Sequence, residues 1–209
     1  MFPQGDLLVM MQEGGWVLWA LGAFSVVCLA VALERVWVLR RERTPMARLV
    51  QALRGTLGSV SRPAVALTAV ERVGGASARV VLAGLERYSL TSEEIEAVME
   101  RRARKELRRL TRGLGLLSST AVTAPLLGFL GTVTGMIASF GALGDYGTSN
   151  PSLVAQGIEE ALLTTAAGLA VAVPVHLVHG LLASRVDRMA HEMEDLGHLL
   201  LDLRRMPNS

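Results

Sequence analysis

The stretch that decides the fold is TAPLLGFLGTVTGMIASF, residues 123–140. It lies inside a run of 32 residues without a charged side chain, from Gly113 to Gly144. Two further charge-free runs are Trp16 to Leu33, with 18 residues, and Ala161 to Ser184, with 24. A helix needs about 20 apolar residues to cross a hydrocarbon core about 30 Å thick. We therefore expect an all-α integral membrane protein with three transmembrane helices rather than a soluble bundle of amphipathic helices.

The basic residues indicate the orientation of these helices. Seventeen of the 21 Lys and Arg lie in 35–112 and the other four in 185–209, whereas 1–33 and 144–160 contain none. Because basic residues accumulate on the cytoplasmic side, both basic segments are expected there, and the basic pI needs no nucleic-acid partner. The expected segments are a periplasmic N-terminus (1–14), transmembrane helix 1 (15–39), a cytoplasmic helical segment (40–112), transmembrane helix 2 (113–143), a periplasmic loop (144–157), transmembrane helix 3 (158–184) and a cytoplasmic C-terminal helix (185–209).

The segment between the first two runs reads as helices with breaks. Thr44 and Pro45 are typical of a cap followed by proline in the first turn, while Pro63 and Gly74–Gly75 interrupt the chain. Thr91, followed by acidic residues, predicts another helix start. The strongest interruption before the second span is a pair of glycines, so we expect that helix to continue into the span.

Two more features concern the helices outside the spans. Asn150–Pro151 predicts the start of a helix that runs through the third span to about Leu203. The charge run Glu100–Glu106 is typical of a solvated helical face, with contact to headgroups or to a partner as the alternative.

Residues for enzymatic or metal chemistry do not form a pattern in this sequence. No Gly-rich loop ends in Gly-Lys-Ser/Thr, so we expect neither an enzyme nor a nucleotide cofactor. His176 and His179 are too few for a structural metal, and packing is favoured over metal binding or proton relay. Cys28 stands alone, so it offers no disulfide. We expect no cofactor and no metal.

The second span carries two different faces on a helical wheel of 100° per residue. One face has a threonine at each end and consists of Thr123, Leu127, Leu130 and Thr134. The other is a stripe of small residues, namely Ala124, Gly128, Gly131, Gly135 and Ala142. Small residues allow the backbones of membrane helices to approach closely, so we expect this stripe at a helix–helix contact. Pro125 frees a carbonyl that protein or water must satisfy; a kink that only serves packing is the alternative.

The third span begins GIEEALLTTAAG, residues 157–168. An ionisable residue in a membrane helix is costly and suggests an ion or proton path. Glu159 and Glu160 differ by 100°, so they cannot share one face, and geometry alone does not choose between them. Thr164 and Thr165 follow within two turns.

The sequences APLLGFLGTVTGMIASF and GIEEALLTTAAGLAVAVP together resemble the paired signature of the MotA/TolQ/ExbB family, the membrane stators that couple ion flow to mechanical work. The likeness covers the second and third spans, about 65 residues, and the three-span topology favours the ExbB/TolQ branch over MotA. The resemblance implies a bacterial inner-membrane homopentamer around two single-span ExbD/TolR-like subunits whose intramembrane Asp carries the proton.

The resemblance also assigns residues. By motif position it places Thr123, Glu160 and Thr165 on the ion pathway; Thr134 and Thr164 are further candidates from the wheel. The wheel sets Thr164, not Thr165, near Glu160, so motif and geometry disagree about that threonine. Gly128, Gly131, Gly135, Pro125 and Pro174 are the expected helix-packing residues. His179-Gly180 replaces the Tyr-Asn usual after the Pro174 segment.

Three functions compete at this stage. The leading interpretation is a proton-driven ExbB/TolQ-like stator that powers a TonB- or TolA-like transducer across the periplasm, surrounded by membrane lipids. A gliding or surface-motility stator would use the same core. A structural scaffold without ion flux is the alternative of another class, although polar residues in apolar spans argue against it. The chain itself identifies neither the transducer nor the ion, proton or sodium.

Overall fold

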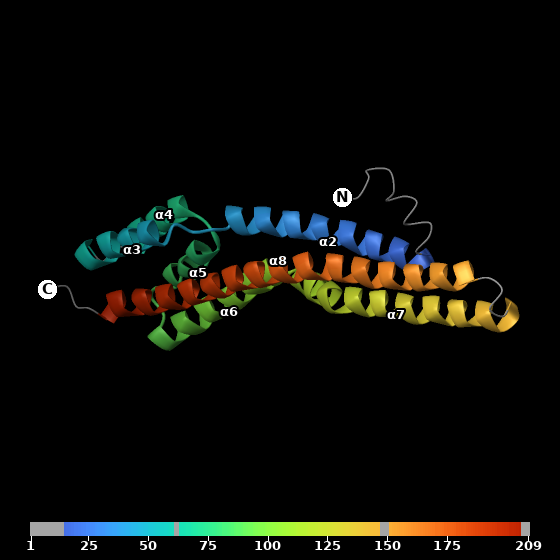
Figure 1. Ribbon diagram of the computed structural model, residues 1–209. Helices are drawn as coiled ribbons and strands as arrows, with labels where there is room; N and C mark the ends of the chain where they lie inside the picture. The colour runs from blue at the N-terminus through green and yellow to red at the C-terminus, as the bar shows by residue number, and fades with distance from the viewer. Residues whose placement is uncertain (1–14, 61–62, 147–150, 206–209) are drawn as a thin grey trace. The chain divides into compact units, whose positions relative to one another are not determined.

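The structure is a computed structural model that describes residues 15–60, 63–146 and 151–205 (Figure 1). Every regular element in these ranges is an α-helix, which confirms the all-α class. The helices are α2 (Gly15–Arg41), α3 (Met46–Val60), α4 (Pro63–Val73), α5 (Ala76–Leu85), α6 (Ser92–Thr111), α7 (Leu114–Tyr146) and α8 (Pro151–Arg205). The expected periplasmic N-terminus lies outside the described residues, as does part of the expected loop 144–157.

Three of the described helices, α2, α7 and α8, are long and apolar enough to cross a membrane. They correspond to the three charge-free runs of the sequence. Helix α8 begins at Pro151 and continues to Arg205, close to the end predicted at about Leu203. The chain divides into two compact units. The apolar unit contains 15–33 and 113–180, and the charged unit contains 34–112 and 181–205.

The apolar unit is built from α7, residues 151–180 of α8 and residues 15–33 of α2, with α7 and α8 side by side (Figure 1). Its core is small and consists of Val17, Leu18, Leu21, Ala124 and Ala172. Large apolar side chains point outward instead; Val26, Leu126, Phe129, Ile137 and Leu162 each expose more than half of their surface. Such an outer surface suits lipid or another apolar helix.

In the charged unit, α3 packs on α4, α4 on α5, and α5 on α6. These helices are amphipathic, and their buried sides form a core to which the end of α8 also contributes; it includes Leu49, Leu53, Val70, Ile95, Leu110, Leu196 and Leu200. Gly84 of α5 lies close to α6 and α8, because a β-carbon there would stand 2.9 Å from Leu200 Cδ2 and 2.6 Å from Met99 Sδ. This unit therefore has an ordinary soluble-type core.

The predicted cap of α6 is confirmed. Thr91 Oγ1 accepts a hydrogen bond from Glu94 N at 3.3 Å, and Glu94 Oε2 accepts one from Thr91 N at 3.0 Å. These reciprocal bonds form a capping box that satisfies two free backbone donors. The hydrogen bond from the Thr91 backbone lowers the pKa of Glu94.

The prediction for Thr44 was wrong about which helix it caps. Helix α3 does begin beside Pro45, whose carbonyl accepts from Arg48 N at 3.0 Å. Thr44 Oγ1, however, accepts from Ser77 N at 3.3 Å in the first turn of α5. The close approach requires Gly75, because a β-carbon at its φ of 90° would overlap the Thr44 hydroxyl.

The expectation of one helix running from α6 into α7 was also wrong. Arg112 leaves the helical region with ψ 130°, and Gly113 follows with φ 85°. That positive φ is accessible to glycine at little cost and to other residues only with strain. Gly113 therefore ends α6, and α7 starts at Leu114.

Candidate functional site

The small-residue stripe of α7 faces α8 of the same chain. A β-carbon on Gly128 would lie 2.8 Å from the Thr164 carbonyl oxygen, and one on Gly135 would lie 2.8 Å from that of Gly157. A β-carbon on Gly131 would overlap the Thr164 side chain. The two backbones are thus in van der Waals contact along the stripe, which is the close approach that small residues permit.

The stripe on α8 is equally small, and the contact is reciprocal. A β-carbon on Gly168 would lie 2.7 Å from the Ala124 carbonyl oxygen, while one on Gly157 would overlap Ser139 Oγ. We call this contact between α7 and α8 the glycine seam; its residues are Ala124, Gly128, Gly131, Gly135 and Ser139 of α7, and Gly157, Ala161, Thr164 and Gly168 of α8. The seam determines which other faces of α7 and α8 remain available to a partner.

The two adjacent threonines of α8 have different environments. Thr164 is 1% exposed and lies inside the glycine seam, where its Oγ1 donates to the Ala161 carbonyl at 2.8 Å. Thr165 is half-buried beside the seam and donates to the Gly128 carbonyl at 3.1 Å. Thr164 is thereby enclosed by its own chain, whereas part of Thr165 stays accessible to a neighbour.

The two predicted pathway threonines of α7 lie outside the seam. Thr123 and Thr134 are both exposed. Thr134 Oγ1 donates to carbonyls of its own helix, at 3.1 Å to Leu130 and 3.0 Å to Gly131. The single chain therefore places Thr164 and Thr165 at the seam and leaves Thr123 and Thr134 on the exposed surface of α7.

The two acids near the start of α8 also differ in exposure. Glu159 is exposed, in a shallow apolar depression formed with Ala155, Ile158, Leu162, Leu163 and Ala166. Glu160 is half-buried, one turn before Thr164. The structure thus gives the two carboxylates different surroundings, Glu159 on the outer surface and Glu160 nearer the seam.

The remaining predicted residues lie within continuous helices. Pro125 is half-buried within α7, and Pro174 is exposed within α8, so its ring is not part of the glycine seam. His176 is exposed and His179 is half-buried. Among the described residues, no three His, Cys, Asp or Glu side chains gather in a metal-binding arrangement.

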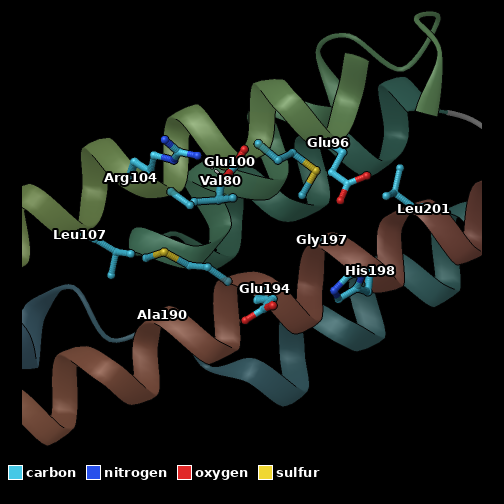
Figure 2. Close-up of a pocket in the computed structure, with 13 residues that line it drawn as sticks. Val80, Glu96, Glu100, Arg104, Leu107, Ala190, Glu194, Gly197, His198 and Leu201 are labelled. Carbon is cyan, nitrogen blue, oxygen red and sulfur yellow. Dashed lines mark hydrogen bonds and ion pairs between the residues drawn. The ribbon is translucent and has the colours of Figure 1, made fainter. Parts of the chain in front are cut away.

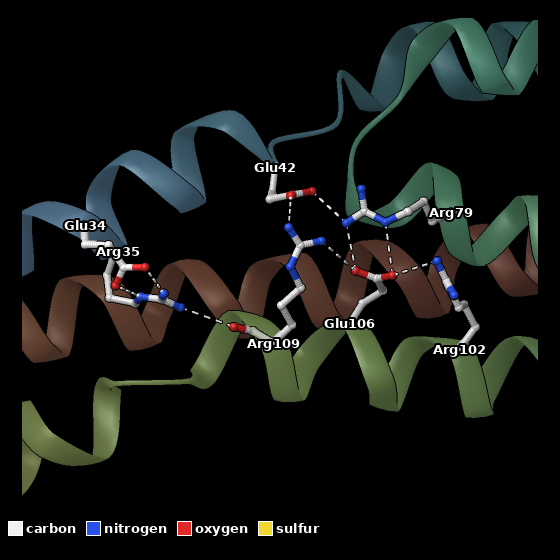
Figure 3. A network of polar contacts seen from close by, with 7 residues as sticks. All are labelled: Glu34, Arg35, Glu42, Arg79, Arg102, Glu106 and Arg109. Atoms are coloured by element: carbon white, nitrogen blue, oxygen red, sulfur yellow. Dashed lines mark hydrogen bonds and ion pairs between the residues drawn. The ribbon is translucent and has the colours of Figure 1, made fainter. Parts of the chain in front are cut away.

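A buried ionic cluster in the charged unit was missed by the sequence analysis (Figure 3). Arg79 of α5 bridges two carboxylates, with Nη2 2.6 Å from Glu42 Oε2 and 2.7 Å from Glu106 Oε2. Arg102 Nη2 is 3.1 Å from Glu106 Oε1, and Arg109 Nη2 is 3.0 Å from Glu42 Oε1. We call these five residues the Arg79 cluster. It connects Glu42, the residue after α2, to α5 and α6.

Both acids of the Arg79 cluster are largely buried, since the side chains of Glu42 and Glu106 are 11% and 5% exposed. Burial alone raises the pKa of Glu106. The hydrogen bond and charge of Arg79, together with the charges of Arg102 and Arg109, lower this pKa by more than burial raises it, so the net pKa lies below the usual range. Glu106 therefore stays ionised at neutral pH. The acids stand 64 positions apart, and no short-range sequence pattern pairs them.

The fold and the seam define a helical membrane protein with a closely packed pair of spans that carries polar residues on its outer surface. The family model described as the MotA/TolQ/ExbB proton channel family matches residues 73–195. This chain belongs to that family. The match spans α7 and most of α8, including Glu159 and Glu160, and it confirms the resemblance found in the sequence.

Individual relatives support the same family assignment. The chain is 30% identical over 194 residues to the putative biopolymer transport protein ExbB homolog of Methanothermobacter thermautotrophicus, covering 91% of this chain and 67% of the relative. It is 36% identical over 177 residues to the putative biopolymer transport protein ExbB-like 1 of Synechocystis sp., covering 82% and 68%. With the biopolymer transport protein ExbB of Salmonella typhimurium it shares 34% over 103 residues, 49% of this chain and 42% of the relative.

Proposed function

We propose that this chain is the ExbB/TolQ-like stator subunit of a proton-driven motor in the bacterial inner membrane. Family membership and the ExbB relatives support a proton-channel subunit. In this proposal the chain performs no enzymatic reaction and needs no cofactor. Its task is to hold a channel in which proton movement drives a partner.

The observation that carries the proposal is the exposure of Thr123 and Thr134 on α7. The glycine seam occupies one side of α7, and these hydroxyls lie outside it, on a span whose exposed side chains are otherwise mainly apolar. A lipid surface gives a threonine no advantage over valine, whereas a polar partner helix can use its hydroxyl. We propose that this face lines a central space shared with a single-span ExbD/TolR-like subunit.

The assembly follows from that role. We propose a ring of five copies around the partner helices, with an intramembrane Asp of the partner as the proton carrier. Thr123, Glu160 and Thr165 line its surroundings, and Thr134 extends the same polar path. A TonB- or TolA-like transducer, or a motility component, receives the work.

The proposed orientation places residues 1–14 and 144–157 in the periplasm. The charged unit and the end of α8 then lie in the cytoplasm, as the distribution of basic residues favours. The exposed apolar side chains of α2, including Trp19 and Leu29, face lipid in this arrangement.

A flux measurement tests the proposal. The chain would be reconstituted into vesicles alone and together with the single-span protein encoded beside its gene, and pH changes inside the vesicles followed after a potential is imposed. We expect proton flux only with both proteins present, and loss of that flux when the partner's intramembrane Asp is replaced by Asn. A complex that assembles with its partner but conducts neither protons nor sodium would identify a structural scaffold instead.

A further inference from the structure

A groove lies in the charged unit between α6 and α8, with Val80 of α5 at its base (Figure 2). Its volume is about 360 Å³. The apolar lining consists of Val80, Met99, Ala103, Leu107, Ala190, Met193 and Leu201. Two of these are methionines, whose flexible side chains adapt to the shape of a binding partner. We call this feature the α6–α8 groove.

Charged side chains line the same groove, and acids predominate. Glu96 and Glu100 of α6 and Glu194 of α8 supply three carboxylates, against Arg104 as the one cation that is always charged in the lining. Arg104 is already paired with Glu100 of its own helix. Glu194 Oε2 lies 3.9 Å from Nδ1 of His191 on the same helix. The groove thus combines an apolar floor with an excess of negative charge.

Another face of α6 carries the opposite charge. Arg101, Lys105 and Arg108 recur at spacings of four and three residues, so they lie on one side of the helix. All three are exposed, and none belongs to an ion pair among the described residues. We call them the basic stripe. On a wheel of 100° per residue, the basic stripe lies about 140° from the groove-lining residues of α6.

We infer that the basic stripe of one copy docks into the α6–α8 groove of a second copy of this chain. The inference rests on the homo-oligomer of the proposed function and specifies one of its contacts. Long cationic side chains suit this groove, because their methylene stems can lie on the apolar floor while their charged ends reach the carboxylates. The net negative groove and the unpaired positive stripe complement each other.

The positions of the two surfaces agree with a ring. The stripe and the groove lie on different faces of α6, so the contact between two copies is head-to-tail. Each copy can therefore bind one neighbour through its stripe and another through its groove, which allows a ring to close. An anionic lipid headgroup could also bind the basic stripe, but it would leave the apolar, acidic groove uncovered. A second copy accounts for both surfaces at once.

Disulfide cross-linking tests the contact. In a background in which buried Cys28 is replaced by Ala, one tagged copy carries Gly197→Cys in the groove and another carries Lys105→Cys in the stripe. Gly197 is suitable because an added β-carbon would meet only Met99 Cε, at 3.5 Å. The matched control replaces Gly197→Cys by Asp195→Cys, an exposed position of α8 that does not line the groove. The membrane complex is oxidised in a nonionic detergent without anionic lipid.

We expect a disulfide between the two tagged copies with Gly197→Cys and its loss with Asp195→Cys. Adding Arg101→Glu and Arg108→Glu to the Lys105→Cys copy should abolish the cross-link, and adding Glu96→Lys and Glu194→Lys to the groove copy should restore it. The inference is overturned if full-size complexes form without the disulfide, or if charge exchange fails to restore it; the ring itself would then stand. A protein that stays monomeric by mass would overturn both the ring and this contact. Cross-linking that requires anionic vesicles, and depends on the stripe but not on the groove acids, would assign the stripe to lipid.

Discussion

Gly131 of α7 lies against Thr164 of α8 so closely that a β-carbon on Gly131 would overlap the threonine side chain. The two residues are 33 positions apart and belong to the two spans that the family signature identifies. Their contact belongs to the glycine seam, which separates the side of α7 that packs within the chain from the side that faces outward.

The first prediction concerns that contact. Gly131→Leu should force α7 and α8 apart, at a cost of about 1–3 kcal/mol or more, because a packed backbone contact cannot accept a large side chain. Thermal unfolding in detergent and the mass of the complex would measure the effect. Gly141→Leu is the matched control on α7, since nothing lies within 4 Å of a β-carbon there. A Gly131→Leu protein that forms full-size, active complexes would contradict the role of the seam.

The second prediction concerns the acids of α8. Glu160→Gln should abolish proton flux while the complex still assembles, whereas Glu159→Gln should retain flux. Gln keeps the shape and hydrogen bonding of Glu but cannot ionise, so it separates charge from structure. If Glu160→Gln conducts and Glu160→Ala does not assemble, the residue is a structural anchor. If Glu159→Gln is inactive and Glu160→Gln is active, the assignment by motif position is wrong.

The third prediction separates the adjacent threonines. Thr165→Ala should lower flux in a complex of normal size and stability, and Thr165→Ser should restore it, because in the proposed pathway Thr165 acts through its hydroxyl. Thr164→Ala should instead lower the unfolding temperature and leave the flux of each intact complex nearly unchanged, because Thr164 is enclosed in the seam. Equal flux losses per complex in both alanine variants would contradict this division.

The fourth prediction concerns the Arg79 cluster. Glu106→Gln should destabilise the charged unit by roughly 2 kcal/mol at neutral pH, because it removes the buried carboxylate that Arg79 and Arg102 both pair with and leaves Glu42 as the one acid of the cluster. Glu100→Gln should cost much less, since its pair with Arg104 is exposed. Thermal unfolding monitored by circular dichroism would compare the two variants with the unaltered protein.

The pH dependence of the Glu106 contribution has a defined sign. The folded-state pKa of Glu106 lies below its ordinary value, so its stabilising effect is present at neutral pH and is lost as the pH falls through the folded pKa. The stability difference between the unaltered protein and Glu106→Gln should therefore shrink in acid, below about pH 4.5. A difference that stays constant down to that range and below it would show that ionisation is not the cause.

The fifth prediction is the orientation of the chain in the membrane. A cysteine introduced at Ser149 should react with a membrane-impermeant reagent in intact spheroplasts, and one at Ser92 should react only after lysis. Cys28 is buried and would be replaced by Ala as a precaution. Labelling of Ser92→Cys with protection of Ser149→Cys in intact spheroplasts would reverse the topology.

The features that could be predicted from the sequence are those set by local composition. Charge-free runs identified the long apolar helices, and Thr91 with Glu94 identified the start of α6, because a capping box is complete within four residues. The wheel found the small stripe of α7. It could not tell which helix meets the stripe, since that depends on the connection that brings α8 back alongside α7.

The features that could not be predicted depend on residues far apart in the chain or on one backbone angle. Thr44 caps a helix that starts more than thirty residues later, and the bridge from Arg79 to Glu42 and Glu106 joins three separate segments. A single glycine in a sequence does not by itself predict the end of a helix, but the positive φ of Gly113 does end α6. Spacing rules describe one helix at a time, so they do not detect such contacts.

The glycine seam also fixes the axial position of one span against the other. Most of its residues are glycine or alanine, which would let two helices slide past each other by one turn, about 5.4 Å. Thr164 is the one β-branched side chain in the seam, and it sits in the notch left by the missing side chain of Gly131. A threonine seated in that notch acts as a key: it selects a single register for two otherwise smooth surfaces, so a force applied to α7 is passed to α8 without sliding.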